Sequence, residues 1–397
     1  MLRVLYLVHD LSDPSVRRRV LMLQAGGAAV TLAGFRRGEN RLADIEGVTP
    51  LELGTTADAR FAQRLLAIAG AATLLPRHLA GIARPDVILA RNLEMLPLAG
   101  RASTRFDGVP IAYECLDVHR LLLQKGMAGR AVRAAERHFG RKAGLIITSS
   151  PAFVEHYFKP HSGIRAPVHL LENQVLELDR GQPGLPVRTR PAGAPWRIGW
   201  FGAIRCRKSL DLLSAFTRQM EGRFEVELRG RPAYSEFDDF DGLVAREPFL
   251  HFEGPYRNPE DLSAIYADVD FAWAIDFFEE GQNSLWLLPN RLYEGCRHGA
   301  LPIVLDGTET ARLALQRGVG IALRDGRVET LANRFSAFDG DAYRAFYANL
   351  VKLGPRPWIA DRGDCAAFVQ RLAALRQPAM PRALPSLVAN KVDCHDR

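Results

Sequence analysis

Short apolar runs alternate along the chain with stretches of helical periodicity. Residues 2–8 (LRVLYLV) form a continuous apolar run of strand length, and residues 12–14 (SDP) after it are typical of a helix start. Residues 15–27 have a helical period and end in two glycines, and residues 28–35 (AAVTLAGF) form a second strand-like run. Strand, helix and strand in this order predict a βαβ unit and therefore a parallel sheet.

The same alternation continues on both sides of a segment rich in Pro, Gly and Arg, residues 179–195, which we interpret as a linker. Further strand-like runs lie at 85–90, 110–115, 144–150, 168–173, 196–202, 224–230, 249–254, 270–275, 301–305 and 320–323. We predict an α/β protein with two Rossmann-like, doubly wound domains facing a cleft. The expected divisions are an N-terminal domain at 1–185, a C-terminal domain at 186–360, an amphipathic helix at 361–376 that can pack back on the first domain, and a loose tail at 377–397.

Cysteine usage and hydropathy narrow the class of protein. The five cysteines are dispersed without a C-x-x-C pair, which argues against a disulfide framework or structural zinc and for a reducing compartment. The apolar N-terminal run is followed too soon by Asp10 and Asp13 for a signal peptide, and no apolar run is long enough to span a bilayer. We expect a cytoplasmic protein that is soluble or peripheral on the inner face of the plasma membrane.

The positive charge is concentrated in the first half of the chain. Residues 1–190 contain 26 Lys and Arg against 17 Asp and Glu, a net +9 in a chain of net +7, so the remainder carries −2. This distribution indicates an anionic surface or ligand on the N-terminal side, for which membrane phospholipid and nucleic acid are both candidates. Residues 60–84, with apolar runs between arginines, suit docking on anionic lipid, although an ordinary packed helix pair explains them slightly better.

The first candidate site follows the strand at 196–202. Gly202 allows a ligand to approach the backbone closely, and Arg205, Arg207 and Lys208 surround the start of a helix. Cations at a helix N-terminus interact unfavourably with the helix dipole unless an anion lies among them. A diphosphate would interact favourably with both the cations and the helix N-terminus. A solvated basic loop is the alternative.

The second candidate site follows the strand at 249–254. The strand ends at Gly254, and the backbone from Phe252 to Tyr256 can receive a planar base. Asn258 is expected as the N-cap of the next helix, and simple capping would explain most of this pattern.

The third candidate site is the stretch "NSLWLLPNRLYEGC" at 283–296. Pro289 predicts that a helix begins there, which places Asn290, Arg291 and Glu294 in its first turn. Asn290 and Glu294 are four residues apart and can face one ligand, and the carboxylate suits the hydroxyls of a ribose or a sugar. The alternative is a first-turn Glu stabilised by the helix dipole.

In the first half, three proton-active side chains lie within six residues. Glu114, Asp117 and His119 follow the strand at 110–115 and can supply a general base or position an acceptor hydroxyl. Asp117 can equally be a helix N-cap and His119 a surface residue. The chain has no G-x-G-x-x-G after the first strand, no G-x-x-x-x-G-K-[ST] and no nucleophile elbow, which argues against dinucleotide oxidoreductases and P-loop enzymes.

These motifs together resemble the GT-B glycosyltransferases, in particular the bacterial family-4-like group and its exopolysaccharide transferases of the succinoglycan type. The similar segments are "RIGWFGAIRCRKSLDLL", "HFEGPYRNPEDLSAIYADVDFAWA", "LPNRLYEGCRHGALPIVL", "YLVHDLSDPSVRRRVLMLQAGGAAVTLAGFRR" and "YECLDVHRLLL". The resemblance covers most of residues 1–375. It implies a hexosyltransferase that moves a sugar from a nucleotide-sugar donor, UDP-sugar favoured, to a lipid-linked oligosaccharide acceptor in exopolysaccharide biosynthesis.

The resemblance also implies roles for single residues. Arg205 and Lys208 would bind the donor diphosphate beside Gly202, and Glu294 would bind hydroxyls of the ribose or donor sugar. Many members of the family carry an additional Glu eight residues earlier, where this chain has Trp286. No metal or other cofactor is expected, because "DVD" at 268–270 runs into a buried strand and Arg205 and Lys208 can neutralise the diphosphate.

The expected partners are a nucleotide-sugar, a lipid-linked saccharide acceptor and the anionic inner-membrane surface, with no nucleic acid. Two other classes stay open. A nucleotide-sugar 2-epimerase of the same architecture would need no lipid acceptor. A non-catalytic binder of nucleic acid would use the basic first half, but its Arg-rich segments lack interleaved aromatic residues.

Overall fold

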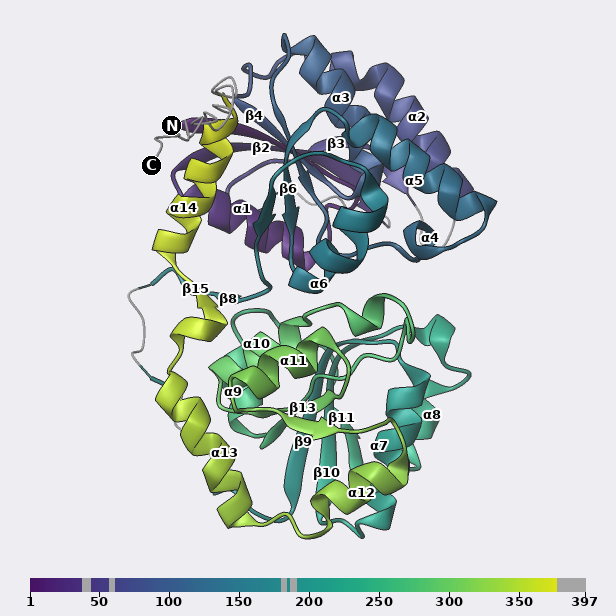
Figure 1. Ribbon diagram of the computed structural model, residues 1–397, viewed down its shortest axis with the longest axis vertical. Helices are drawn as coiled ribbons and strands as arrows, with labels where there is room; N and C mark the ends of the chain where they lie inside the picture. The colour runs from purple at the N-terminus through teal and green to yellow at the C-terminus, as the bar shows by residue number, and fades with distance from the viewer. Residues whose placement is uncertain (38–43, 57–60, 180–183, 186–190, 377–397) are drawn as a thin grey trace, which may run out of the picture.

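The computed structural model describes residues 1–37, 44–56, 61–179, 184–185 and 191–376, with residues 61–66 described by their backbone only. Two parallel β-sheets divide these residues into two Rossmann-like domains, one above the other in Figure 1. The predicted fold class is thereby confirmed.

The N-terminal domain contains a sheet of seven strands in the order β3-β2-β1-β4-β5-β6-β7. The strands are β1 (Leu2–Val8), β2 (Ala28–Arg37), β3 (Leu51–Thr56), β4 (Val87–Arg91), β5 (Ile111–Glu114), β6 (Ala143–Thr148) and β7 (Val168–Leu170). All neighbours are parallel, so Val4 in β1 lies beside Val30 in β2 and Val87 in β4. The central strands β1, β4, β5 and β6 are buried almost throughout, which explains why their sequences are mainly continuous apolar runs rather than alternating ones.

Helices cover both faces of this sheet. They are α1 (Pro14–Ala25), α2 (Phe61–His78), α3 (Leu96–Arg105), α4 (Arg120–Leu123), α5 (Met127–Gly140) and α6 (Pro151–Phe153), which continues as a π-helical segment at Val154–Ser162. Asp13 caps α1 by accepting a hydrogen bond from the Ser15 amide, as the residues before Pro14 predict. The segment at 60–84 is mainly α2, in which Ile68, Ala71 and Leu75 are buried in the domain core and Leu74 is 43% exposed.

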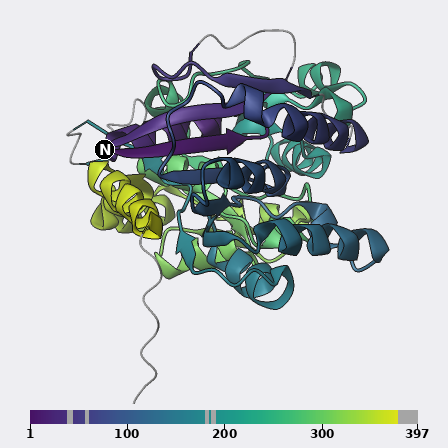
Figure 2. The same ribbon diagram turned by 90° about the horizontal axis from the view of Figure 1, so that it is seen from above.

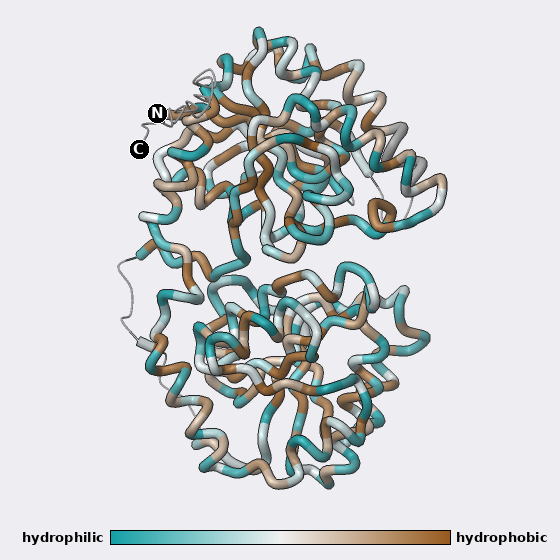
Figure 3. The backbone as a smooth tube through the Cα atoms, viewed as in Figure 1, coloured by the Kyte–Doolittle hydropathy of each residue, from teal (hydrophilic) through white to brown (hydrophobic). Residues whose placement is uncertain are grey.

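The C-terminal domain contains a sheet of six strands in the order β11-β10-β9-β12-β13-β14. The strands are β9 (Trp196–Ile204), β10 (Phe224–Pro232), β11 (Leu250–Phe252), β12 (Phe271–Trp273), β13 (Leu301–Leu305) and β14 (Ile321–Leu323). The helices are α7 (Arg207–Gln219), α8 (Phe240–Ala245), α9 (Leu262–Ala267), α10 (Asn290–Arg297), α11 (Glu309–Gln316), α12 (Val328–Ser336) and α13 (Gly340–Leu353). Figure 3 shows hydrophobic positions along the strands of both sheets, where the two main cores lie.

The chain crosses between the domains twice. Two short strands, β8 (Val175–Leu176) and β15 (Ile359–Ala360), pair in parallel beside the domains. Helix α14 (Arg362–Ala373) then returns to the N-terminal domain, where Phe368 shares a core with β1 (Figure 2). Glycine is needed at Gly26, because a Cβ there would lie 2.4 Å from the Cys365 carbonyl oxygen on α14.

The structure contains one strand that the sequence did not predict, and it leaves two expected segments wholly or mostly undescribed. Strand β3 was not predicted, because its sequence LELGTT is polar and Gly54 in it has φ 147°. The expected tail at 377–397 and most of the expected linker at 179–195 lie outside the described residues.

Candidate functional site

The candidate site of the C-terminal domain lies where the strand order of its sheet reverses. Strand β9 has β10 on one side and β12 on the other. The chain therefore continues from β9 to one side of the sheet and from β12 to the other side. Ligands of doubly wound sheets bind beyond the carboxyl ends of the strands at such a switch point. Arg205 follows β9 directly, and an acidic and aromatic segment, residues 276–280 (DFFEE), follows β12.

Arg205 and Lys208 both face this acidic segment. The Arg205 guanidinium lies 3.7 Å from an Asp276 carboxylate oxygen and 4.5 Å from the ring centroid of Phe278. The Lys208 ammonium donates hydrogen bonds of 2.7 Å to both carboxylate oxygens of Glu280. Both cations are about half exposed, so these pairs are weak and an incoming anion can replace the carboxylates.

Arg291 adds a third cation that is incompletely satisfied. It lies in the first turn of α10, whose start at Asn290 agrees with the prediction from Pro289. Its Nη1 atom is buried and has no hydrogen-bond partner among the residues that the structure describes. Burial lowers the pKa of Arg291, the charge of Asp276 opposes this effect, and the charge of Arg205 adds to it. A guanidinium with one buried, unpartnered nitrogen, beside a second cation at a helix N-terminus, is a favourable place for an anion.

Glu294 lies one turn further along α10 and is almost fully buried. Its carboxylate accepts a hydrogen bond of 2.9 Å from the Asn258 side-chain amide and lies 3.5 Å from the Tyr266 hydroxyl. Burial raises the pKa of Glu294, whereas Asn258 and the charges of Arg18 and Arg291 lower it. The expectation that Asn258 caps the next helix is wrong. Helix α9 begins at Leu262 with Asp261 at its N-cap, and the Asn258 side chain instead donates a hydrogen bond to Glu294.

Tyr256 lies near this carboxylate, and two predicted glycines lie beside Tyr256 or in its loop. Gly202 has φ 109°, and a Cβ there would have the Tyr256 hydroxyl as its nearest neighbour, at 3.9 Å. Gly254, with φ 76°, accepts a hydrogen bond from the Gly230 amide and holds the loop that carries Tyr256. Burial raises the pKa of Tyr256, and the charge of Glu294 raises it further. Gly202, Tyr256 and Glu294 are therefore close together, whereas Asn290 lies exposed at the first position of α10.

Asp117 joins this site from the N-terminal domain. It follows β5, and its carboxylate accepts a hydrogen bond from the Asn283 side chain of the other domain. Asp117 is an exposed residue, yet neighbouring protein groups partly desolvate its carboxyl group and raise its pKa, against the effects of Asn283 and Arg205. The pKa of Glu279 is also raised, first by burial and then by the charge of Asp117. Two carboxylates with raised pKa values thus meet beside the Arg205 cation.

Glu114 and His119 are not placed for the same chemistry. Glu114 is fully buried, and it binds Arg19, Arg91 at 3.2 Å and the Tyr6 hydroxyl at 2.7 Å. This network holds the ends of three strands and α1 together, so we correct the catalytic expectation for Glu114 to a structural role. The exposed His119 caps α4 by accepting a hydrogen bond of 3.2 Å from the Leu121 amide at its Nδ1 atom.

Trp286 stands where the family pattern has a second carboxylate, and it contacts the N-terminal domain. Its ring stacks on His156 with centroids 5.3 Å apart, and its carbonyl oxygen accepts a hydrogen bond of 2.5 Å from the Ser150 hydroxyl. Trp286 therefore belongs to the interface between the domains.

Sequence reasoning did not find four residues that the structure adds to the site. They are Arg18, Tyr266, Asp276 and Glu279. Asp276 and Glu279 follow β12 in the same way that Arg205 follows β9, and this signal was available in the sequence. Arg18 and Tyr266 occur inside helical patterns, where nothing distinguishes them from other helix residues.

Two kinds of feature are absent from the described residues, a membrane-spanning helix and a metal-binding cluster. No helix in them is both long and apolar enough to cross a membrane. No group of three or more His, Cys, Asp and Glu side chains in them is arranged to hold a metal ion.

Comparisons with known proteins concern the family and the fold of the chain. A family model described as a glycosyl transferase 4-like domain matches residues 13–174. The succinoglycan biosynthesis protein ExoL of Rhizobium meliloti (strain 1021) is 60% identical over 389 residues, which cover 97% of this chain and 96% of that protein.

Solved structures with the same overall arrangement are more distant in sequence. Sucrose-phosphate synthase from Thermosynechococcus elongatus has a TM-score of 0.71 at 13% identity, covering 94% of this chain and 98% of that one. Anabaena HepE in complex with UDP has a TM-score of 0.65 at 14% identity, covering 94% of this chain and 100% of that one. At these identities the likeness concerns the fold.

Proposed function

The chain belongs to the glycosyltransferase 4-like family and has the GT-B fold, and from this premise we propose which transfer it carries out. The proposed reaction moves a hexosyl group from a nucleotide-sugar, UDP-sugar favoured, to a lipid-linked oligosaccharide during succinoglycan-type exopolysaccharide synthesis. The relative named as a succinoglycan biosynthesis protein supports the pathway class, and the HepE complexes with UDP and with UDP and glucose support the donor class.

The observation that carries the donor assignment is the unsatisfied Nη1 atom of Arg291 beside Arg205. A diphosphate would accept hydrogen bonds from both guanidinium groups and relieve their mutual repulsion. Lys208 would join them after leaving Glu280. On this assignment Glu294, which Asn258 orients, accepts hydrogen bonds from the ribose hydroxyls, and the nucleoside base lies along the loop of Gly254 and Tyr256.

Asp117 is the group that we assign to the acceptor hydroxyl. Partial desolvation raises the pKa of Asp117, which strengthens its carboxylate as a proton acceptor. Its hydrogen bond to Asn283 holds it at the contact between the domains, beside the cations that would carry the donor. Glu279 then lies close enough to influence the charge of Asp117 and to contact the donor sugar.

We also propose that transfer needs no metal ion. The three cations Arg205, Lys208 and Arg291 can balance the charge of a bound diphosphate and of the leaving nucleoside diphosphate.

Calorimetric titration with UDP tests the donor site. Arg205→Ala and Glu294→Ala should each weaken binding by about tenfold or more, because hydrogen bonds to charged groups contribute about 1.5–3 kcal/mol. The matched control is Arg207→Ala: this neighbouring arginine is equally exposed but pairs with Asp211 and Asp238, and its loss should change the affinity less than about threefold. Unchanged affinity of both site variants for UDP, GDP and other nucleoside diphosphates would refute the assignment.

Incubation of the protein with a UDP-sugar alone separates transfer from epimerisation. A transferase leaves the sugar unchanged or releases it slowly to water, whereas appearance of the epimer would sink the transferase proposal. Addition of a membrane extract that contains lipid-linked saccharides should then produce a radiolabelled, solvent-extractable lipid from a labelled donor.

A further inference from the structure

Helix α1 of the N-terminal domain carries two neighbouring arginines that reach the C-terminal domain. They are Arg17 and Arg18, near the end of α1 that follows β1 (Figure 1). Both side chains are partly buried. Neither belongs to the cation group of Arg205, Lys208 and Arg291, and the proposed function gives neither of them a role.

Arg17 binds the loop that follows β11. Its Nη1 atom donates a hydrogen bond of 2.9 Å to the Asn258 carbonyl oxygen, and its Nη2 atom donates one of 3.1 Å to the Glu260 carboxylate. Arg17 therefore joins the two domains at two points, a main-chain oxygen and a charged side chain. A guanidinium suits such a contact, because its donors have a fixed planar geometry.

Glu46 orients Arg17 from within the N-terminal domain. Its carboxylate accepts a hydrogen bond from the Arg17 Nε atom. Glu46 lies in a tight turn with φ 54°, which is uncommon for a residue other than glycine, and its carbonyl oxygen accepts a hydrogen bond of 2.9 Å from the Gln24 side chain on α1. The remaining donors of the Arg17 guanidinium are thereby directed at the C-terminal domain.

Asn258 connects this contact to the candidate donor site. Its carbonyl oxygen accepts from Arg17, and its side-chain amide donates the hydrogen bond of 2.9 Å to Glu294. Asn258 is exposed, so packing restricts its side chain little. The loop around it is a closed unit, because Arg257 and Asp261 bind each other through backbone and side-chain hydrogen bonds. A main chain fixed at Asn258 therefore also fixes the amide that orients Glu294.

Arg18 connects α1 to the helix that carries Glu294. Its Nη2 atom donates a hydrogen bond of 2.9 Å to the Asn173 side-chain oxygen, and the Asn173 Nδ2 atom donates one of 2.9 Å to the Leu288 carbonyl oxygen, just before α10. Burial raises the pKa of Glu294, and the charge of Arg18 opposes this effect. Two adjacent residues of α1 thus hold the two segments that position Glu294, the loop at 258–260 and the start of α10.

We propose that Arg17 is a positioning residue for the ribose of the nucleotide: it fixes Asn258 across the domain interface, and Asn258 directs Glu294 at the ribose hydroxyls. This inference rests on the proposed function, which assigns Glu294 to those hydroxyls. Its consequence is that the N-terminal domain takes part in selecting the donor through a residue that need not touch it. The Arg17 and Glu260 side chains are 40% and 45% exposed, so their ion pair contributes little stability and Arg17 acts mainly on the orientation of Glu294.

Calorimetric titration with UDP and with 2′,3′-dideoxyuridine diphosphate tests the proposal, because the ratio of the two affinities measures what the ribose hydroxyls contribute. The parent protein should prefer UDP by about tenfold or more, and Glu294→Ala should bind both ligands almost equally. Arg17→Gln should lower the preference for UDP to about threefold or less and keep the affinity for the dideoxy ligand within about twofold. In a Glu294→Ala background, Arg17→Gln should have no further effect, because it acts through that carboxylate.

A second variant acts on Arg17 from the other side. Glu46→Gln removes the carboxylate that orients Arg17, and it should lower the preference for UDP in the same direction. The hydrogen bonds of Glu46 to Arg17 and Gln24 lie within the N-terminal domain, so a direct effect of Glu46 on the nucleotide does not explain such a loss. The affinity of each variant for the dideoxy ligand also reports that the variant folds.

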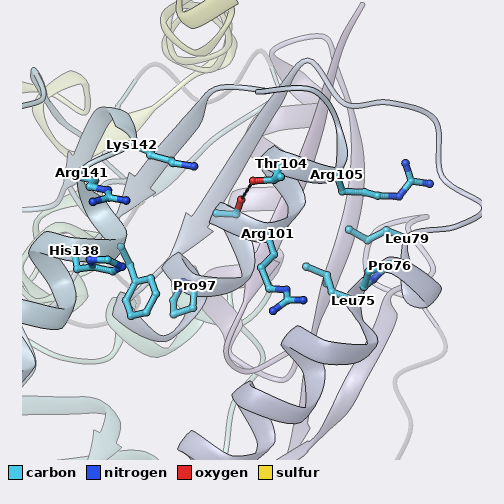
Figure 4. Close-up of a pocket in the computed structure, with 12 residues that line it drawn as sticks. Leu75, Pro76, Leu79, Pro97, Arg101, Thr104, Arg105, His138, Arg141 and Lys142 are labelled. Carbon is cyan, nitrogen blue, oxygen red and sulfur yellow. Dashed lines mark hydrogen bonds between the residues drawn. The ribbon is translucent and has the colours of Figure 1, made fainter.

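Arg101→Gln is the matched control. Arg101 is an exposed arginine of the same domain, and it lines a separate cavity of about 460 Å³ whose lining residues all belong to that domain (Figure 4). Its replacement changes the net charge by the same amount as Arg17→Gln. It should leave the preference for UDP as in the parent.

The outcomes separate this proposal from the proposed function. If the parent prefers UDP and Arg17→Gln keeps that preference, the proposal is overturned and the donor assignment stands. Equal losses of affinity for both ligands in Arg17→Gln, or the same change in Arg101→Gln, would reveal a general electrostatic effect on the diphosphate and overturn the proposal too. A parent that binds both ligands equally would refute the assignment of Glu294 to the ribose, and this inference with it.

Discussion

Replacing Arg291 by methionine should weaken nucleotide binding and at the same time stabilise the unliganded protein. Arg291 is a partly buried cation whose buried Nη1 atom has no hydrogen-bond partner among the described residues, and desolvation lowers its pKa. Methionine has a similar length and no charge, so it can fill the same space without the desolvation cost. The two effects have opposite signs because the same charge is unfavourable without an anion and favourable with one.

The magnitudes follow from that geometry. An unsatisfied buried donor costs about 1–3 kcal/mol, so we expect the free energy of unfolding of the C-terminal domain to rise by about that amount. For a domain of this size this corresponds to an increase in Tm of about 2–10 °C. Loss of a charge-assisted hydrogen bond to the diphosphate, about 1.5–3 kcal/mol, should weaken UDP binding by about 10- to 150-fold.

Arg297→Met is the control on the same helix. Arg297 is also buried, but its guanidinium binds the Glu177 carboxylate and the Gly184 carbonyl oxygen. Its removal leaves Glu177 without this partner, so this variant should lower Tm and leave the UDP affinity within about threefold. Scanning calorimetry without ligand and titration with UDP measure both quantities. If Arg291→Met lowers Tm and keeps the UDP affinity, Arg291 is a structural residue and the donor assignment loses its main support.

Three other predictions concern catalysis, pH and metal. Asp117→Asn should lower kcat by about 10²- to 10⁴-fold and leave UDP affinity within about threefold, and an unchanged kcat would exclude Asp117 as the base. Burial raises the pKa of Glu136, which the Tyr113 and Tyr157 hydroxyls contact, to about 7 from an ordinary 4.5. The stability that protonated Glu136 contributes is complete below about pH 4.5 and is lost as pH rises through 7. In urea unfolding, Glu136→Gln should therefore reduce the change in the free energy of unfolding between pH 5 and 8 by about 3 kcal/mol. The same change with pH in both proteins would contradict this. Excess chelator should leave the transfer rate unchanged, and restoration of a lost rate by Mg²⁺ would show that the cations are insufficient.

Much of the fold was readable from the sequence because buried parallel strands leave a strong signal. Strand β1 coincides with its predicted range, and β13 does as well, since both are continuous apolar runs with clear ends. The start of α10 was readable because Pro289 cannot continue a helix from the preceding residues. The edge strand β3 carries no comparable signal, because only one of its residues, Leu53, is buried.

The site was only partly readable, because sequence order gives the loops but not the contacts between them. The rule that ligands bind after strands correctly predicted the positions of Arg205 and of the helix that carries Glu294. The same rule also selected Glu114, which has a structural role. Asn258 has the sequence context of a helix cap, and its actual partner Glu294 is 36 residues away. Such contacts depend on how separate elements pack, which no local pattern determines.

Two pairs of arginines in this protein show which physical property separates structural from functional charge. In the N-terminal domain, Arg19 and Arg91 enclose Glu114, which holds each of them with a charge-assisted hydrogen bond. Asp13 forms a further ion pair with Arg91 at 3.2 Å, so two carboxylates balance the two guanidinium groups and no ligand is needed. In the C-terminal domain, Arg291 and Arg205 repel each other, and Asp276 lies 3.7 Å from Arg205, too far for a hydrogen bond. A folded protein retains such an unbalanced arrangement at a cost in stability, and an anionic ligand that completes it recovers that cost as binding energy. Whether each guanidinium has a carboxylate within hydrogen-bond distance, rather than its residue type or its place after a strand, therefore distinguishes the two groups.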